Sequence, residues 1–235
     1  MSRSPSEPAD VLVVGAGVIG LCAALALEAR GRRVRVVERG RVGRGSSWAN
    51  CGLVTPSHGL PLAVPGMIGK TLRWMLRGDA PFHVRPRLDP SMLAWSLNFF
   101  RRCTTARLGP TVRAKAALLL LTRETLPRWI AEARIDCEWE ERGLYMVYAS
   151  EQEFHAMDAL DPLLAEHGLP CTRLDGAELA RREPAVRAGM AGARFYGMDA
   201  HLRPDRLVSE LERVLRARGV PIDEDCPVLG FEREG

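Results

Sequence analysis

A glycine-rich turn between a short apolar run and an alanine-rich stretch constrains this chain more than any other feature. Residues 10–14 form the run DVLVV, which is typical of a fully buried parallel strand. The turn GAGVIG follows at residues 15–20, and residues 21–30 then form a strongly helix-forming stretch that Gly31 ends. Residues 34–37 predict a second strand. The sequence therefore predicts a β–α–β unit whose turn is built from glycine.

Each glycine of the turn has its own task in such a unit. Gly15 permits the tight turn out of the strand, Gly17 lets a pyrophosphate approach the backbone, and Gly20 lets the helix pack closely on the sheet. The helix N-terminus offers free N–H groups and the positive end of its dipole to phosphates. Glu38 ends the second strand 18 residues after Gly20, where its carboxylate can accept both ribose hydroxyls. These features together predict a dinucleotide site, whereas an unrelated glycine-rich turn would leave Glu38 unexplained.

Composition excludes several other classes of protein. The 235 residues are 46% hydrophobic and 26% charged, as is usual for globular proteins. The 33 basic and 29 acidic residues are interspersed, so no basic stripe for nucleic acid is predicted. The six cysteines show no CxxC spacing, and neither a metal site nor a redox dithiol is expected. The longest strictly apolar run, residues 116–121, is far shorter than the roughly 20 residues that span a bilayer, and no signal peptide is recognisable. We therefore expect a cytoplasmic protein.

The loop after Glu38 carries a resemblance that selects FAD among the dinucleotides. Residues 39–52 are rich in small side chains and do not form the second amphipathic helix of a simple NAD domain. Residues 15–38, the segment SSWANCG at 46–52, and residues 55–76 resemble the D-amino-acid-oxidase-like FAD oxidoreductases. The last of these stretches is most similar to bacterial D-amino acid dehydrogenases. The resemblance implies an α/β fold: a Rossmann-like FAD-binding domain of the glutathione-reductase type, with an inserted α+β substrate cap.

The resemblance also assigns residues to the cofactor. It implies that the turn holds the pyrophosphate, that the end of the second strand holds the adenosine, that the following loop lies along the ribityl chain and flavin, and that a later strand touches the adenine. In chain order these residues are Gly15, Ala16, Gly17, Val18, Ile19, Gly20, Glu38, Arg39, Ser46, Ser47, Asn50, Gly52 and Val228. Some relatives attach the flavin through a histidine in this loop. Ala49 stands at that place, so we expect noncovalent FAD. Cys51 lies close to the predicted flavin, where packing is favoured over a reactive thiol.

The rest of the chain alternates between helical and strand patterns. We expect helices over residues 64–80, 91–102, 110–133, 151–167, 175–182 and 205–218, and strands over residues 143–148, 171–174, 193–202 and 220–228. The resemblance divides the chain into an FAD-binding domain (residues 1–60 and 203–235), a helical segment packing on it (61–136) and a substrate-binding cap (137–202). Residues 229–235 resemble the entry to a hairpin, and relatives continue beyond it. We therefore expect an incomplete FAD domain, with the remainder in a longer chain or a second subunit, unless the protein is a remnant.

The resemblance implies the oxidative deamination of a D-amino acid. Hydride passes from the α carbon to flavin N5, and hydrolysis of the imino acid gives a 2-oxo acid and ammonia; the flavin carries the chemistry. Three alternatives remain: an oxidase or dehydrogenase of secondary amines, glycine, sarcosine or D-hydroxyproline; a noncatalytic FAD-binding fragment; and an NAD(P) dehydrogenase. The likeness to dehydrogenases favours a quinone or another respiratory acceptor over oxygen.

No catalytic residue can be assigned from the sequence. The substrate-side candidates are His58, in the loop after the flavin segment, and Tyr145 and Tyr148 on a predicted strand; a structural role is the more common outcome for each. The two tyrosines face the same side only if their strand bulges. Asp199 and His201 would share one face of a strand, but without a third group the pattern favours a structural role.

The apolar surface around residues 60–74 allows two interpretations. Peripheral contact with the inner face of the cytoplasmic membrane would suit electron delivery to a quinone. Packing on the body of the protein is favoured, because scattered arginines and prolines give no clear amphipathic face.

Overall fold

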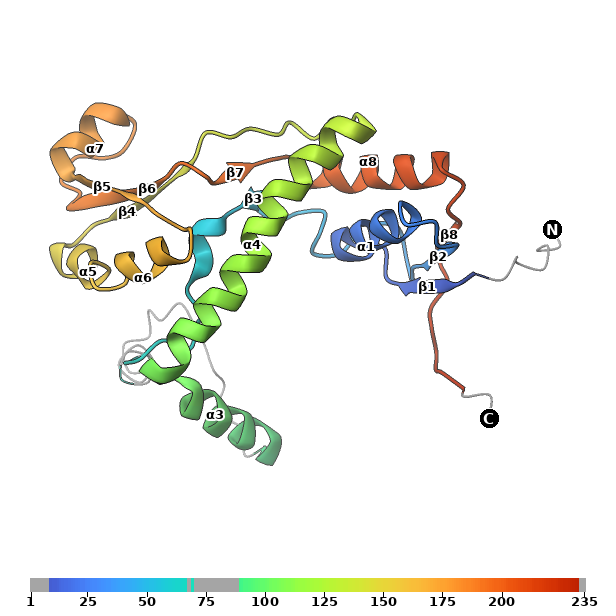
Figure 1. The fold of residues 1–235 in the computed structure, drawn as a ribbon, viewed down its shortest axis with the longest axis horizontal. Helices are drawn as coiled ribbons and strands as arrows, with labels where there is room; N and C mark the ends of the chain where they lie inside the picture. Colours follow the sequence, from blue (N-terminus) through green and yellow to red (C-terminus); the bar gives the residue numbers. More distant parts are fainter. Residues whose placement is uncertain (1–8, 67–68, 70–88, 233–235) are drawn as a thin grey trace. The chain divides into compact units, whose positions relative to one another are not determined.

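The computed structural model describes residues 9–66, 69 and 89–232, and the chain divides into two compact units. The first unit consists of residues 1–54, 125–141 and 200–235, and the second of residues 55–124 and 142–199. Each unit is built around a sheet of its own (Figure 1). Most of the helix predicted over residues 64–80 and about half of the apolar surface at residues 60–74 lie outside the described residues.

A parallel sheet forms the centre of the first unit. Its strands are β1 (Val11–Val14), β2 (Val34–Val37) and β8 (Ile222–Asp223), in the order β1-β2-β8. Helix α1 (Val18–Glu28) connects β1 to β2, and helix α8 (Pro204–Ala217) precedes β8. Parallel neighbours need such helical crossovers, so the predicted β–α–β unit is confirmed. A short antiparallel pair, β3 (Leu53–Val54) with β7 (Ala200–His201), belongs to the same unit.

The core of the first unit lies between the sheet and the two helices α1 and α8 (Figure 1). Leu21 and Ala24 of α1 are fully buried, as are Leu211 and Leu215 of α8, and they pack with Val36 of β2. These α8 positions recur at helical spacing on one face, so α8 is a half-buried amphipathic helix. The packing fixes the turn between β1 and α1 against the sheet.

The second unit contains an antiparallel sheet with helices on both faces. Its strands are β4 (Leu144–Tyr148), β6 (Gly192–Tyr196) and β5 (Thr172–Asp175), in the order β4-β6-β5. Its short helices are α5 (Glu151–Ala156), α6 (Asp161–Glu166) and α7 (Gly176–Arg182). Phe154, Leu164 and Leu179 are the buried anchors of these three helices.

Two longer helices precede this sheet in the chain. Helix α3 (Pro90–Arg102) begins at Asp89, whose side chain accepts a hydrogen bond from the Ser91 N–H. Helix α4 (Thr105–Ala133) starts five residues before its predicted start. Residues 105–124 of α4 belong to the second unit and residues 125–133 to the first. In the second unit, α4 packs Val112 and Ala116 against Leu164 and Leu169.

Several predicted elements are interrupted or shorter than expected. The helix predicted over residues 151–167 is divided into α5 and α6, because Pro162 is accommodated only in a first helical turn. The strand predicted over 193–202 ends at Tyr196, and a turn separates it from β7. The strand predicted over 220–228 is limited to β8, since the chain turns at Asp225 with a φ of 50°. Residues 229–232 form no strand, so the prediction that a hairpin begins here is wrong for the described residues.

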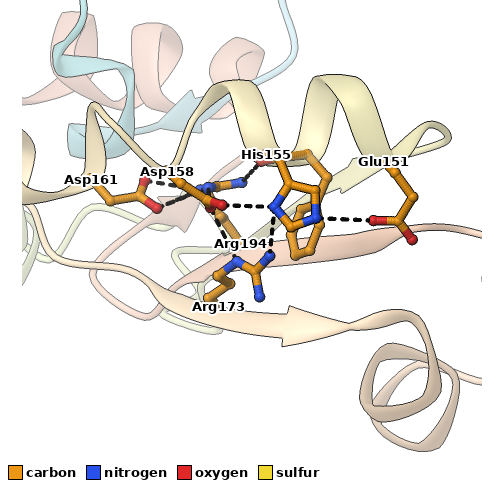
Figure 2. A network of polar contacts seen from close by, with 7 residues as sticks. Glu151, His155, Asp158, Asp161, Arg173 and Arg194 are labelled. Atoms are coloured by element: carbon orange, nitrogen blue, oxygen red, sulfur yellow. Dashed lines mark hydrogen bonds and ion pairs between the residues drawn. The ribbon is translucent and has the colours of Figure 1, made fainter.

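A buried guanidinium ties the short helices of the second unit to its sheet. The Arg194 side chain, on β6, is 0% exposed. Its Nε lies 2.9 Å from both Asp161 carboxylate oxygens, and its Nη2 lies 2.6 Å from Asp158 Oδ1. Its Nη1 donates to the Phe154 carbonyl oxygen at 2.9 Å. Figure 2 shows these groups converging on one point, so every Arg194 nitrogen has a partner.

Exposed side chains around the two aspartates extend this network (Figure 2). His155 Nδ1 lies 2.8 Å from Asp158 Oδ2, its Nε2 lies 3.4 Å from Glu151, and Arg173 Nε donates to Asp158 at 3.1 Å. The hydrogen bond from His155, with those from Arg173 and the charge of Arg194, holds the pKa of Asp158 below its ordinary value. A carboxyl group with a lowered pKa stabilises the fold at neutral pH, and this contribution is lost as the pH falls through that lowered pKa.

Replacement of Arg194 by methionine is expected to lower the free energy of unfolding by about 3 kcal/mol, because it leaves the Asp161 and Asp158 carboxylates without their buried partner. Urea denaturation followed by tryptophan fluorescence measures this loss. Arg173→Met is the matched control: this side chain is 42% exposed, and its loss is expected to cost less than about 1 kcal/mol. Equal losses in the two variants would contradict the assignment of Arg194 as the central group.

Candidate functional site

The turn from β1 into α1 depends on two glycines. Gly15 has a φ of 103°, a conformation that L side chains rarely adopt, and its N–H donates to the Val37 carbonyl oxygen at 2.8 Å. A Cβ on Gly20 would lie 1.9 Å from the Gly15 carbonyl oxygen. The helix can therefore start this close to the strand only with glycine at both positions. This agrees with the tight turn predicted for Gly15 and the close helix packing predicted for Gly20.

The N-terminus of α1 is capped from a distant part of the chain. Gly17 occupies the N-cap position without a side chain to cap it, and the first turn holds no acidic residue. The Val18 N–H instead donates to Ser47 Oγ at 3.0 Å. A Cβ on Gly17 would lie 3.1 Å from that same oxygen. Ile19, in the first turn, is 84% exposed. The start of the helix thus carries neither a capping side chain of its own nor an acidic residue in its first turn, and such a helix start favours an anion.

Glu38 stands where β2 ends, beside the turn. Its Oε2 accepts a hydrogen bond from the Ala16 N–H at 2.8 Å, and its Oε1 accepts one from the Gly40 N–H at 3.1 Å. Each carboxylate oxygen can accept a second hydrogen bond, so the group keeps capacity for hydroxyl donors. Arg39 follows as an exposed side chain. The structure therefore brings the predicted acidic residue directly to the glycine turn.

The loop after β2 is held against the same turn by groups that the sequence did not reveal. The Gly43 N–H donates to the Ala16 carbonyl oxygen at 2.9 Å, and the Val42 N–H donates to Glu224 at 2.9 Å. That backbone hydrogen bond, with Arg41, holds the pKa of Glu224 below its ordinary value. Gly43 has a φ of 70°. It is one of several glycines in the loop, and Glu224 lay inside a predicted strand, so neither was recognisable from local pattern.

The end of the loop is ordered by an asparagine. Asn50 Nδ2 donates to the Ser46 carbonyl oxygen at 3.1 Å, and Asn50 Oδ1 accepts from the Gly52 N–H at 2.7 Å. Gly52 has a φ of 63°, and a Cβ there would lie 2.0 Å from the Leu202 carbonyl oxygen. The structure thus brings Ser46, Ser47, Asn50 and Gly52 into one folded loop beside the turn.

Val228 is the one predicted cofactor residue whose expected element is missing. It was placed on a strand over residues 220–228, but it lies beyond β8 in an irregular segment and is 37% exposed. Its contact with an adenine stays a prediction without the strand that was to position it.

The substrate-side candidates lie in the second unit and are not brought together on one strand face. Tyr145 pairs with Phe195 and Tyr148 with Gly192 in an unbroken antiparallel register, so the strand has no bulge and the two tyrosines point to opposite faces. The Tyr145 ring lies 4.7 Å from the Phe195 ring, whereas Tyr148 lies beside Arg194. Burial raises the pKa of Tyr148, and the Arg194 charge opposes this rise.

The remaining histidine candidates also have separate surroundings. His58 lies exposed in the one-turn helix η1 (Pro56–Gly59). Asp199 and His201 do not pair: Asp199 accepts the Ser57 N–H at 3.0 Å, and His201 Nε2 lies 3.8 Å from Glu140. Among the described residues no cluster of three or more potential metal ligands occurs, and no helix there is long and apolar enough to cross a membrane.

Comparison with known proteins places these features in a family. The model of the family described as FAD dependent oxidoreductase matches residues 10–235. The chain is 36% identical over 193 residues to D-amino acid dehydrogenase 2 of Mesorhizobium japonicum, covering 80% of this chain and 46% of that protein. It is 33% identical over 232 residues to the D-amino acid dehydrogenase of Paramagnetospirillum magneticum, covering 96% of this chain and 54% of the relative. The chain spans about half the length of these relatives.

Solved structures agree at the level of the fold. Glycine oxidase from Geobacillus kaustophilus superimposes with a TM-score of 0.64 at 22% identity, over 92% of this chain and 46% of that one. L-amino acid deaminase from Proteus vulgaris gives a TM-score of 0.68 at 17% identity, over 100% of this chain and 49% of that one. The predicted α/β fold and family resemblance are confirmed, while the identification of an inserted cap stays a prediction.

Alanine substitution separates the two tasks of the glycine turn. Gly20→Ala is expected to lower the free energy of unfolding by about 2 kcal/mol or more, because its Cβ meets backbone that cannot move aside. Gly17→Ala is expected to cost less than about 1 kcal/mol, because its Cβ meets only the tip of a serine side chain. Thermal or urea denaturation checks both. A Gly20→Ala variant as stable as Gly17→Ala would contradict the close helix packing.

Thiol reactivity is expected to follow burial and pH. Burial raises the pKa of both Cys22 and Cys137 to about 11, and only the thiolate is alkylated. At pH 8 about one in a thousand of these thiols is ionised, and their labelling is expected to rise about tenfold per pH unit from pH 7 to 9. Cys51 is exposed and is expected to react first. Iodoacetamide labelling read by peptide mass spectrometry tests this order. Labelling of Cys22 at the rate of Cys51 would contradict the packing of α1.

Proposed function

Because the chain belongs to the family of FAD-dependent oxidoreductases, we propose that it binds FAD noncovalently and serves the oxidation of a D-amino acid to a 2-oxo acid and ammonia. The observation that carries the proposal is the start of α1. There Gly17 at the N-cap adds no side chain, the Val18 N–H donates to Ser47 Oγ, and the Glu38 carboxylate accepts the Ala16 N–H. This is the donor and acceptor set that a dinucleotide requires.

Different residues of the chain would contact different parts of FAD. The turn residues Gly15, Ala16, Gly17, Val18, Ile19 and Gly20 would hold the pyrophosphate, since a helix N-terminus favours negative charge. Glu38 would accept the ribose hydroxyls, and Arg39 and Val228 would contact the adenosine. Ser46, Ser47, Asn50 and Gly52 would line the ribityl chain and flavin. Ala49 offers no side chain for covalent attachment.

The reaction needs little acid–base chemistry from the protein. When bound, FAD supplies the acceptor for the hydride of the substrate α carbon. The protein would bind the amino acid, orient its α carbon and exclude water. We assign this task to the cap of residues 137–202 together with His58. Tyr145 or Tyr148 would face the substrate, but not both, because the two side chains point to opposite faces of β4. Residues 1–60 and 203–235 would form the FAD domain. The helical segment predicted over residues 61–136 is divided between the two units at residue 125.

The relatives support a D-amino acid as the substrate, and other substrate classes occur among the similar structures. The two D-amino acid dehydrogenases above, at 36% and 33% identity, support a D-amino acid. The likeness to glycine oxidase keeps glycine, together with secondary amines such as sarcosine and D-hydroxyproline, as the second candidate, and it rests on fold alone. A C-terminal portion of a longer chain, or a second subunit, would supply the half of the relatives' length that this chain does not span.

We further propose a quinone or another respiratory acceptor and a cytoplasmic protein with peripheral contact at the inner membrane face. Helix α3 supports such a contact in the described residues. Its Trp95 and Leu97 are 65% and 55% exposed, and Arg101 and Arg102 follow in its last turn. Exposed apolar side chains next to basic ones favour an anionic bilayer surface. No nucleic acid partner is proposed.

Flavin binding and flavin reduction test the proposal together. The purified chain is expected to bind FAD, with protection of Cys51 against alkylation and no protection of Cys171 in the second unit. Glu38→Gln and Gly17→Ala are expected to weaken FAD binding about tenfold or more. The first replaces an acceptor oxygen for the ribose hydroxyls, and the second adds a methyl group where the pyrophosphate approaches the backbone. Gly109→Ala, in α4 with open space around it, is the matched control. D-alanine or D-proline is expected to bleach the bound flavin.

The other outcomes select the alternatives. Bleaching by sarcosine or glycine alone supports the second candidate, and bleaching by L-amino acids alone contradicts the D assignment. Bound flavin that no amine reduces indicates a noncatalytic fragment. Binding of NADH without flavin indicates an NAD(P) dehydrogenase. Reoxidation of the reduced flavin by a soluble quinone, and not by oxygen, is the result expected for a respiratory acceptor.

A further inference from the structure

A short buried turn in the second unit presents one exposed polar side chain. In η1, Pro56, Ser57 and Gly59 are buried and His58 is exposed. A Cβ on Gly59 would lie 2.3 Å from Leu169 Cδ1, so the turn packs tightly on its own core. Immediately afterwards, Lys115 Nζ donates to the Leu60 carbonyl oxygen at 2.9 Å. The turn is thereby fixed, and His58 projects from a rigid base.

A buried carboxylate holds the middle of this turn. Asp199 is 0% exposed, and its Oδ1 accepts the Ser57 N–H at 3.0 Å. The Asp199 backbone is itself fixed, because its carbonyl oxygen accepts from the Gly143 N–H at 3.0 Å and its N–H donates to Tyr196. Among the described residues, Asp199 Oδ2 has no hydrogen-bond partner. A buried carboxylate that is only half satisfied is costly for stability, which points to a role in placing Ser57.

The contact between the Ser57 hydroxyl and the His58 ring favours one position for the proton of His58. Ser57 is 3% exposed, and its Oγ lies 3.2 Å from His58 Nδ1. A buried hydroxyl proton requires an acceptor, and Nδ1 is the acceptor at hand. When Nδ1 accepts, a neutral imidazole carries its proton on Nε2, the nitrogen on the far side of the ring. His58 therefore offers an N–H donor from a fixed turn.

We propose that Asp199 and Ser57 are positioning residues that hold His58 as the Nε2–H form, and that His58 donates a hydrogen bond to the carboxylate of the amino acid substrate. This role rests on the proposed function, because it assumes an amino acid substrate. An N–H donor to a carboxylate forms a charge-assisted hydrogen bond that fixes the orientation of the ligand. The carboxylate is the group that all amino acid substrates share, so His58 would serve binding and orientation, not the transfer of hydride.

The protonation of His58 can be measured by nitrogen-15 NMR of the chain, without turnover. The expected result is a proton on Nε2 in the unmodified protein and a mixture of both forms in Ser57→Ala. Acetate, used as a simple carboxylate probe, is expected to shift the His58 Nε2–H resonance and to leave the His167 resonances unchanged. A proton on Nδ1 in the unmodified chain, or no response to acetate, would overturn the inference.

Kinetics of flavin reduction test the same role in the working protein. His58→Phe is expected to raise KM about tenfold to a hundredfold with kcat changed less than about threefold, the range for one hydrogen bond to a charged group. His58→Gln keeps an N–H donor and is expected to recover most of the loss. Asp199→Asn can still accept the Ser57 N–H and is expected to stay close to the unmodified chain, whereas Asp199→Ala raises KM. His167→Gln is the matched control.

The failure of this inference and the failure of the proposed function give different results. Normal KM in Asp199→Ala and Ser57→Ala, with lowered thermal stability alone, shows that both residues are merely structural and overturns the inference while flavin reduction continues. A chain whose flavin no amino acid reduces contradicts the proposed function. Even then, the NMR response of His58 to acetate decides whether the turn holds a carboxylate-binding donor.

Discussion

The close approach of two backbones, at Gly15 and Gly20, is the constraint on which the first unit depends. A single methyl group at Gly20 would meet the Gly15 carbonyl oxygen at 1.9 Å, so the helix start and the strand end lie as near to each other as polypeptide allows. The rest of the candidate site follows from this geometry. Glu38 reaches the Ala16 N–H, and Gly43 reaches the Ala16 carbonyl oxygen, only because Ala16 is fixed between the two glycines. A dinucleotide site therefore needs few charged side chains here, since the backbone supplies most of the polar groups.

The second unit depends on buried charge instead of close backbone packing. Its sheet is short, and Arg194 joins β6 to the segment of α5 and α6 through two aspartates and a carbonyl oxygen. Asp199 makes a comparable connection at η1 with a single hydrogen bond. Buried charges contribute less to stability than apolar side chains of equal size, but they are satisfied in only one arrangement. Such groups suit a unit that has to present particular side chains in fixed positions.

Local patterns in the sequence were sufficient to predict individual strands and helices, but not every one of their ends. The bounds of β2 were predicted correctly, because a β-branched run between an arginine pair and Glu38 leaves little freedom of register. The end of β6 was missed, since strand length there is set by the partners β4 and β5 and not by the apolar run. Pro162 indicated a break between α5 and α6, because proline is not tolerated inside a helix. The single helix predicted over residues 151–167 followed the apolar spacing instead.

In the candidate site, too, local pattern identified some residues and missed the distant residues that contact them. The residues of the glycine turn and Glu38 were identified from the sequence, because their spacing along the chain is typical of dinucleotide-binding β–α–β units. Their partners were not: Ser47 caps a helix 29 residues away, and Asp199 holds a serine 142 residues away. No periodicity relates such pairs, so a single sequence carries no sign of them. Tyr145 and Tyr148 were nominated by residue type alone, and the regular register of β4 placed them on opposite faces.

The discontinuous first unit has a consequence for biosynthesis. Its third strand, β8, comes from residues 222–223, and α8 packs against α1 from the far end of the chain. A ribosome releases residues 1–54 long before it releases residues 200–235, so the β1–β2 pair must wait without its final partner while the second unit emerges. The second unit lies wholly between these two segments and can complete its own sheet first. The order of folding is therefore expected to run from the inside of the sequence outward, with α8 and β8 joining the first unit last.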